Sequence, residues 1–176
     1  MPFQHRSNPL GASPADSRFC TLNCGFTVLY MATEFATAFI ETVVRDRLER
    51  RHNRTIKVKE VTERVLTTLS TKPKVALKLL DLRGSGCTRI GAPTDTVNAR
   101  NHAAGRAFSK CIHMEHPEVD GIIHASRLTG KDVYAIFDRA VGKLDSTPTR
   151  PLEDHPDLPE IFQEYGINLI LQTYHT

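Results

Sequence analysis

Short apolar runs that suit β-strands alternate irregularly along this chain with segments of helical periodicity. Strands are predicted at residues 26–31, 75–82, 121–125, 133–137 and 168–172, after a short first strand within the Pro- and Gly-containing residues 1–25. Helices are predicted at 34–45 and 98–113, whereas 56–69 fits either structure. Strict βαβ alternation is absent. The pattern therefore predicts an α/β (α+β) fold, in which one central mixed β-sheet is flanked by helices.

The length of the chain favours one domain. It has 176 residues, which is enough for an ordinary hydrophobic core and short for two. Apolar residues make up 40% and charged residues 24%, close to the average of globular proteins, which argues against disorder over the whole length. We expect a single domain over residues 1–176, with its core at about 3–140 and a Pro-rich, acidic C-terminal extension at about 146–176.

The sequence gives no sign of a membrane or nucleic-acid partner. No stretch approaches the roughly 18 uninterrupted apolar residues of a membrane span, and the N-terminus lacks the apolar region of a secretory signal. A basic run extends from Arg45 to Lys59, but no aromatic residue interleaves it to stack on bases. We interpret this run as the solvated face of a helix, and we expect a cytoplasmic protein.

The cysteines do not predict a metal site. Three residues separate Cys20 from Cys24, instead of the two that are typical of zinc ligands, and the sequence has no second close pair of cysteines. His113 and His116 precede a proline that fits a helix end. We therefore expect no metal, and free thiols at the four cysteines.

Two further motifs are weak. The loop over residues 82–88 contains two glycines but lacks the Lys-Ser/Thr ending of a phosphate-binding loop. Ser126 and His124 could form a nucleophile–base pair, yet the G-x-S-x-G turn is missing. Neither motif predicts a function by itself.

Glu41 is harder to explain as an ordinary surface residue. It lies three residues after Ala38, near the apolar stripe of the predicted helix 34–45. An unpaired carboxylate there would cost several kcal/mol, so it needs a cationic or hydrogen-bonding partner. An exposed ion pair with Arg45 is the other interpretation, and the sequence leaves both open. Ser126, directly after the predicted strand 121–125, could likewise open an ordinary turn or face a ligand at a strand end.

Together these segments resemble the RES-domain family, the toxins of RES–Xre toxin–antitoxin systems. A strand with the letters Leu-Tyr-x-Ala leads into a Glu-bearing helix, and a Gly-Ile segment ends at a serine before the next strand. The matching segments are 5–6, 17–19, 28–45, 120–127 and 133–138. The order and spacing agree over about residues 3–140.

The resemblance implies an ADP-ribosyltransferase-like fold that takes NAD+ as its substrate and needs no metal. Arg6 and Arg18 would hold the pyrophosphate, for which the planar guanidinium is suited. Tyr30 would stack on the nicotinamide ring. Glu41 would bind the ribose hydroxyl and stabilise the cationic transition state, and Ser126 would bind the nucleotide or position the attacking group. The carboxylate of Glu34 follows the predicted helix cap, where a structural role suffices.

Three functions remain open. The resemblance favours a toxin that depletes NAD+ by cleaving the nicotinamide–ribose bond, as a glycohydrolase or, with inorganic phosphate as acceptor, a phosphorylase. A mono-ADP-ribosyltransferase that modifies a host protein is the first alternative, and a non-enzymatic binding module is the second. The resemblance also implies a helix-turn-helix antitoxin of the Xre type as partner.

Overall fold

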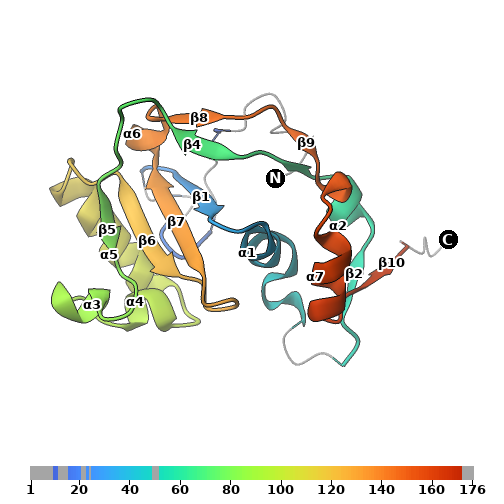
Figure 1. The fold of residues 1–176 in the computed structure, drawn as a ribbon. Helices are drawn as coiled ribbons and strands as arrows, with labels where there is room; N and C mark the ends of the chain where they lie inside the picture. Colours follow the sequence, from blue (N-terminus) through green and yellow to red (C-terminus); the bar gives the residue numbers. More distant parts are fainter. Residues whose placement is uncertain (1–9, 12–15, 21–22, 24, 49–51, 172–176) are drawn as a thin grey trace.

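The computed structural model describes residues 10–11, 16–20, 23, 25–48 and 52–171. The molecule has two parts (Figure 1). One is a β-sheet with the helices that pack on it, and the other is a smaller group of helices and short strands. We call these the sheet half and the helical half. No helix in the described ranges is long and apolar enough to cross a membrane.

The central sheet has four strands and mixed polarity. It consists of β1 (Val28–Ala32), β7 (Asp132–Phe137), β6 (Gly121–Ala125) and β5 (Leu79–Asp81), in that spatial order. The pairs β1–β7 and β6–β7 are antiparallel, whereas β5–β6 is parallel. The prediction of a central mixed sheet flanked by helices is therefore confirmed.

Side-chain alternation assigns the sheet residues to two apolar cores. Val28, Ile122 and Ala135 point to one face, which is packed with aromatic and aliphatic side chains. Leu29 and Ile136 point to the opposite face and belong to a second core. Because successive side chains of a strand point to opposite faces, every second residue of these strands faces the first core.

Helices cover the first of these faces. They are α3 (Gly86–Arg89), α4 (Asp95–Asn98) and α5 (Ala103–Glu115), and a short α6 (Asp138–Val141) follows β7. The guanidinium of Arg139 donates hydrogen bonds to the carbonyls of His113 and His116 at the end of α5, and to that of Val119 in the loop that follows. These bonds pair carbonyls that a helix C-terminus leaves open and so fix α5 against the sheet.

The predicted helix 34–45 changes its winding partway. An α-helix, α1 (Phe35–Phe39), continues as a π-helical turn over Ile40–Val44 and a 3-10 turn over Arg45–Leu48. A strand then follows at Thr55–Lys57, so the basic run does not lie along one helix as predicted. Single π turns within helices are rare and are often found at functional sites.

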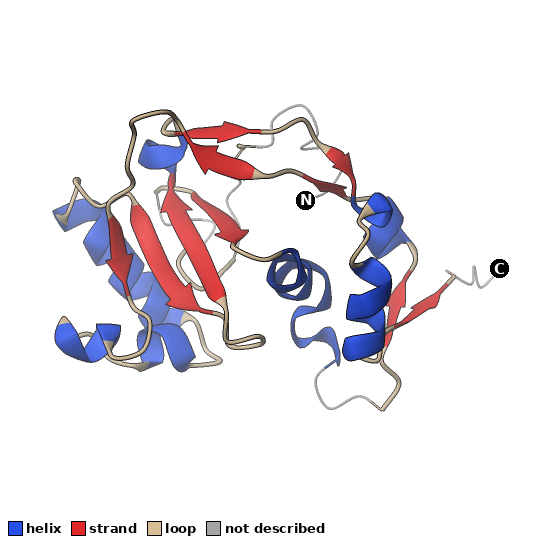
Figure 2. Ribbon diagram, viewed as in Figure 1, coloured by secondary structure: helices blue, strands red, loops and turns tan. Residues whose placement is uncertain are grey.

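The helical half combines two segments that are far apart in the sequence, residues 35–71 and 144–170. Its other elements are β2 (Thr55–Lys57), α2 (Lys59–Thr62), β3 (Val65–Leu66), β4 (Leu69–Thr71), β8 (Leu144–Ser146), β9 (Arg150–Pro151), a 3-10 turn (Leu152–Asp154), α7 (Leu158–Glu164) and β10 (Asn168–Ile170). The antiparallel pairs β4–β8 and β3–β9 form a bridge between the halves (Figure 2). In the hydrophobic core of the helical half, Leu158 and Ile161 pack with Phe39 and Val43. The proposed C-terminal extension is thus packed against the segment that carries Glu41.

The last strand differs from its prediction. Residues 168–172 were expected to close the central sheet, but β10 pairs in parallel with β2 in a separate two-stranded sheet. The reason is the packing of α7 on the helical half, which places the following residues beside β2.

Cys20 also differs from its prediction. It is disulfide-bonded, with its partner outside the described residues, whereas Cys87 and Cys111 carry free thiols as expected. The sulfur of Cys20 is buried and contacts the carbonyl oxygen of Phe26 at 3.2 Å.

The ion pair of Asp120 and Lys143 provides a test of the sheet half. Asp120 is buried. Its carboxylate accepts hydrogen bonds from Lys143 Nζ and from the backbone N–H of Lys78, both at 2.8 Å. We expect Asp120→Ala to lower the free energy of unfolding by about 2 kcal/mol, because two donors lose their acceptor. Urea titration measures this, with Asp145→Ala as the control on an exposed carboxylate. Equal midpoints for the two variants would contradict the prediction.

Candidate active site

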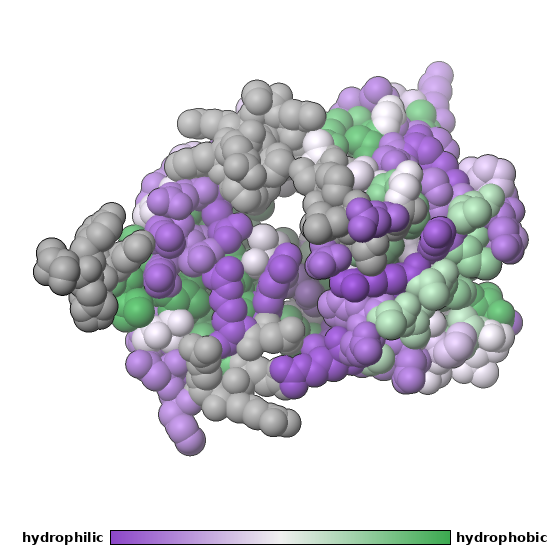
Figure 3. All heavy atoms as spheres, turned by 180° about the vertical axis from the view of Figure 1, so that it is seen from behind, coloured by the Kyte–Doolittle hydropathy of each residue, from purple (hydrophilic) through white to green (hydrophobic). Residues whose placement is uncertain are grey.

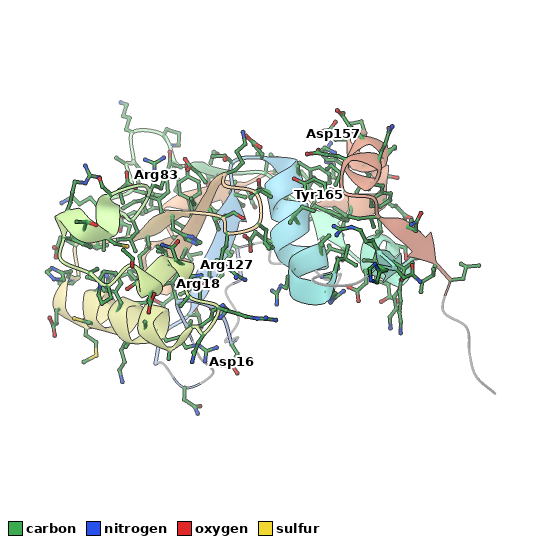
Figure 4. All side chains as sticks on the ribbon, turned by 90° about the horizontal axis from the view of Figure 1, so that it is seen from below. Asp16, Arg18, Arg83, Arg127, Asp157 and Tyr165 are labelled. Atoms are coloured by element: carbon green, nitrogen blue, oxygen red, sulfur yellow. The ribbon has the colours of Figure 1, made fainter. Side chains whose placement is uncertain are left out.

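A cavity lies where the end of the sheet meets the π turn of the helical half. It has a volume of about 240 Å³ and is lined by loop residues 16–18, by β1, by the π turn and by the segment after β6. Arg18 and Arg127 lie near each other beside this junction (Figure 4). From behind, the molecule is hollowed between its halves, with hydrophilic side chains along the hollow (Figure 3).

The structure brings three of the predicted site residues to this cavity. Arg18, Tyr30 and Glu41 all line it, although they come from a loop, a strand and a π turn. Arg6 lies outside the described residues. Glu34, the competing carboxylate, is exposed and pairs with Lys131 at 3.3 Å.

Tyr30 presents its ring to the cavity and buries its hydroxyl. The residue is 38% exposed, while the hydroxyl donates to Ser17 Oγ and accepts from the backbone N–H of Phe19, both at 3.0 Å. Burial raises the pKa of Tyr30 above its ordinary value, and the hydrogen bond with Ser17 opposes this increase. The phenol is therefore neutral at physiological pH, and its hydroxyl fixes the loop that carries Arg18.

Glu41 is held by a hydrogen bond from across the junction. Ser126 Oγ donates to Glu41 Oε1 at 2.5 Å. Arg45 donates instead to the backbone carbonyl of Glu41, at 3.0 Å, so the ion pair considered from the sequence is replaced by a backbone contact. The carboxylate of Glu41 thus has a neutral hydrogen-bond partner and lies in the wall of the cavity.

Ser126 lies behind Glu41. It is 3% exposed, and its oxygen also accepts hydrogen bonds from the backbone N–H groups of Leu128 and Thr129, both at 3.0 Å. A serine hydroxyl has one proton and two lone pairs, so these contacts use its whole capacity. In this geometry Ser126 is placed to position Glu41, and its contact with the nucleotide or the attacking group stays a prediction.

A second contact fastens the same turn to the helix. Thr37 Oγ1 and Thr129 Oγ1 are 3.0 Å apart, and Thr37 is 1% exposed. The turn after β6 is therefore attached to α1 and to the π turn at two points. This double attachment fixes the distance between the sheet and Glu41.

Arg18 is placed by a close approach of α5. Its Nη1 donates to the carbonyl of Ala99 at 2.9 Å. A Cβ at Gly105 would lie 2.7 Å from the carbonyl oxygen of Arg18, so only glycine allows this contact. On the same helix Arg106 Nε donates to the carbonyl of Ser17 at 2.8 Å. The helix α5 therefore contacts the backbone of both Ser17 and Arg18.

Sequence reasoning missed part of the charge around the cavity. Arg45 and Arg127 line it together with Arg18, against the carboxylates of Asp16 and Glu41. Arg45 has a φ of 45°, a strained conformation that is uncommon for a residue with a side chain and that recurs at functional sites. An excess of arginine suits a ligand that carries phosphate groups.

His124 forms another part of the wall that sequence reasoning set aside. It is 6% exposed, its Nδ1 is 3.0 Å from the carbonyl of Ala125, and its ring meets that of Phe19 edge-on. Burial lowers the pKa of His124 to about 4, and the charge of Arg18 acts in the same direction. The hydroxyl of Ser126 points to Glu41, so the structure contains no Ser126–His124 hydrogen bond. The period of two along β6 was the signal that placed both residues on this face.

No group of three or more potential metal ligands occurs within the described part of the chain. The cavity is lined by two carboxylates, an aromatic ring, two histidines and several guanidinium groups. Such a set can hold an anionic ligand and place a negative charge beside a centre that becomes cationic.

Comparison with known proteins identifies the family of the chain from its sequence. The sequence model of the RES domain matches residues 1–159. A relative from Sinorhizobium fredii, named probable toxin y4kH, is 36% identical over 95 residues, which cover 53% of this chain and 75% of the relative. The crystal structure of the M. tuberculosis MbcT–MbcA toxin–antitoxin complex contains a chain of similar fold, with a TM-score of 0.59 and 15% identity over 91% of this chain and 94% of that chain.

The buried state of His124 predicts a pH-dependent stability. Its pKa is about 4 in the folded protein against 6.5 in an exposed histidine, so the unfolded chain binds a proton first as the pH falls. We expect His124 to reduce the free energy of unfolding by about 3 kcal/mol between pH 6.5 and 4. Unfolding of wild type and His124→Gln at pH 7.5 and 4.5 measures this, and an equal loss in both proteins would contradict it. A chemical-shift titration of His124 gives the pKa directly.

Proposed function

The chain belongs to the RES-domain family, and we propose that it is a toxin that cleaves the nicotinamide–ribose bond of NAD+ and so depletes this dinucleotide. The observation that carries the proposal is the carboxylate of Glu41, held by Ser126 in the wall of a cavity that Tyr30 and Arg18 share. The name of the Sinorhizobium fredii relative supports a toxin, and the fold shared with a chain of a toxin–antitoxin complex agrees with it.

The cavity matches the chemistry of this substrate. NAD+ has an anionic pyrophosphate, which suits Arg18 and the neighbouring Arg127. Its nicotinamide ring is flat and cationic, and the exposed ring of Tyr30 offers a face on which such a ring can stack. We assign the pyrophosphate to the arginines and the nicotinamide to Tyr30. Arg6, outside the described residues, remains a candidate for the pyrophosphate.

Glu41 would act on the bond that breaks. When the bond between ribose C1′ and the nicotinamide nitrogen opens, its electron pair leaves with neutral nicotinamide and positive charge develops on the ribose. A fixed carboxylate beside that ribose stabilises the charge in the transition state more than in the ground state. Water then adds to C1′ and releases ADP-ribose and a proton. With inorganic phosphate as acceptor, the product is ADP-ribose-1″-phosphate.

Ser126 would contribute through Glu41. Its proton fixes one carboxylate oxygen, and the turn that holds its own oxygen is attached to α1 through Thr129 and Thr37. A carboxylate held in this way needs little reorganisation as charge develops.

We also propose a cognate antitoxin, of the helix-turn-helix type that the resemblance implies. The cavity opens between two halves of the molecule, and a segment of a partner inserted there would block access of NAD+. Stoichiometric inhibition of nicotinamide release by such a partner would support this assignment.

Glu41→Gln tests the proposed chemistry. We expect the rate of nicotinamide release to fall by roughly 10² to 10³, because the variant loses the fixed negative charge while keeping its shape. The measurement follows NAD+ and nicotinamide by chromatography with purified chain, with and without phosphate. Glu34→Gln is the matched control on a carboxylate of the same segment and is expected to keep wild-type turnover.

The outcomes of this assay separate the functions. Formation of ADP-ribose-1″-phosphate only with phosphate present identifies phosphorolysis. Folded wild type without turnover in either buffer would overturn NAD+ depletion and leave protein ADP-ribosylation or binding.

Ser126→Ala tests the positioning role. We expect kcat to fall by roughly 10-fold, less than for Glu41→Gln, because the charge remains but loses its donor. A double variant of Ser126→Ala and Glu41→Gln is expected to be no slower than Glu41→Gln alone. Additive losses would show that Ser126 acts independently of Glu41.

A further inference from the structure

Among the described residues, four buried side-chain atoms lack a hydrogen-bond partner, and one of them belongs to a residue that lines the cavity. The four are Arg64 Nε, Thr96 Oγ1, Ser109 Oγ and His124 Nε2. Of these residues only His124 lines the cavity. Buried polar atoms in native proteins normally have a partner, so an exception at a binding cavity suggests that the ligand provides it.

The protonation of His124 follows from its surroundings. The carbonyl oxygen of Ala125 can only accept, so the nearby Nδ1 carries the proton. Burial and the neighbouring Arg18 keep the ring neutral at physiological pH. In the neutral ring Nε2 therefore has a lone pair and is a hydrogen-bond acceptor.

His124 and Tyr30 both belong to the wall of the cavity. Both face the same side of the sheet, since Tyr30 is opposite Ala135 and His124 is opposite Val133. Phe19 connects them: its backbone N–H donates to the Tyr30 hydroxyl, and its ring packs against His124 at 5.2 Å between ring centres. Both residues line the same cavity, so one ligand bound there can contact both.

We propose that Nε2 of His124 accepts a hydrogen bond from the carboxamide N–H of nicotinamide, and so makes the cavity selective for an amide-bearing over a carboxylate-bearing base. The inference rests on the proposed function and names the substrate preference of the same site. A nicotinate ring has a carboxylate in place of the amide and cannot donate. Its charge would also face the lone pair of Nε2.

The experiment compares two substrates that differ in this group alone. The purified full chain is assayed with NAD+ and with nicotinic acid adenine dinucleotide, and release of nicotinamide or nicotinate gives kcat and KM for each. We expect kcat/KM to favour NAD+ by roughly 10² to 10⁴, because a buried acceptor left without its donor discriminates strongly.

Variants at His124 assign the preference to this ring. We expect His124→Phe, which keeps a ring but removes the acceptor, to lower kcat/KM for NAD+ by roughly 10- to 100-fold, mainly through KM, and to change the nicotinate substrate much less. His124→Gln supplies an amide oxygen and is expected to restore part of the preference. His52→Phe, at an exposed histidine outside the cavity lining, is the control.

Each outcome decides the inference. A reduced preference in folded His124→Phe supports it. An equal loss of kcat/KM on both substrates would assign Nε2 to a ribose hydroxyl or to packing, and would overturn the inference. Equal use of both substrates by the wild type would also overturn it. In both cases the proposed NAD+ cleavage would stand. Wild type that cleaves neither dinucleotide would overturn the proposed function together with this inference.

Discussion

The hydrogen bond from Ser126 Oγ to Glu41 Oε1 joins the two halves of the molecule at the cavity. A carboxylate near an apolar helix stripe requires a partner, and the turn after β6 provides it. The same turn is bound a second time through Thr129 and Thr37. The sheet and the π turn are thus held at a fixed distance, and the cavity is the space that this distance leaves.

The site combines segments with different structural demands. The sheet places Tyr30 and His124 on one face, because alternate residues of β1 and β6 point the same way. The loop before β1 contributes Arg18, which depends on a glycine of α5 for its place. A rigid sheet and a well-packed helix therefore position the groups that the loops alone could not fix.

Particular residues show how far sequence reasoning reaches. The strands 121–125 and 133–137 are short apolar runs separated by a turn, and both are found almost as predicted. Glu41 was identifiable because its charge conflicts with its helical position. The roles of Ser126 and His124 were not identifiable from the sequence, because each depends on a residue that is distant along the chain. Ser126 depends on Glu41, and His124 depends on Phe19. The strand at the C-terminus failed for the same reason, because pairing depends on where α7 packs.

The sequence by itself determined the kinds of elements, the mixed sheet and the segments that identify the RES-domain family, because these depend on local periodicity and residue order. Only the tertiary structure decided that Ser126 donates its hydrogen bond to Glu41, and that arginines from three separate segments line one cavity. It also decided that His124, which lines this cavity, has a buried ring nitrogen without a partner among the described residues. Hydrogen-bond partners and desolvation are properties of three-dimensional neighbours, and the spacing of residues along a chain does not specify them.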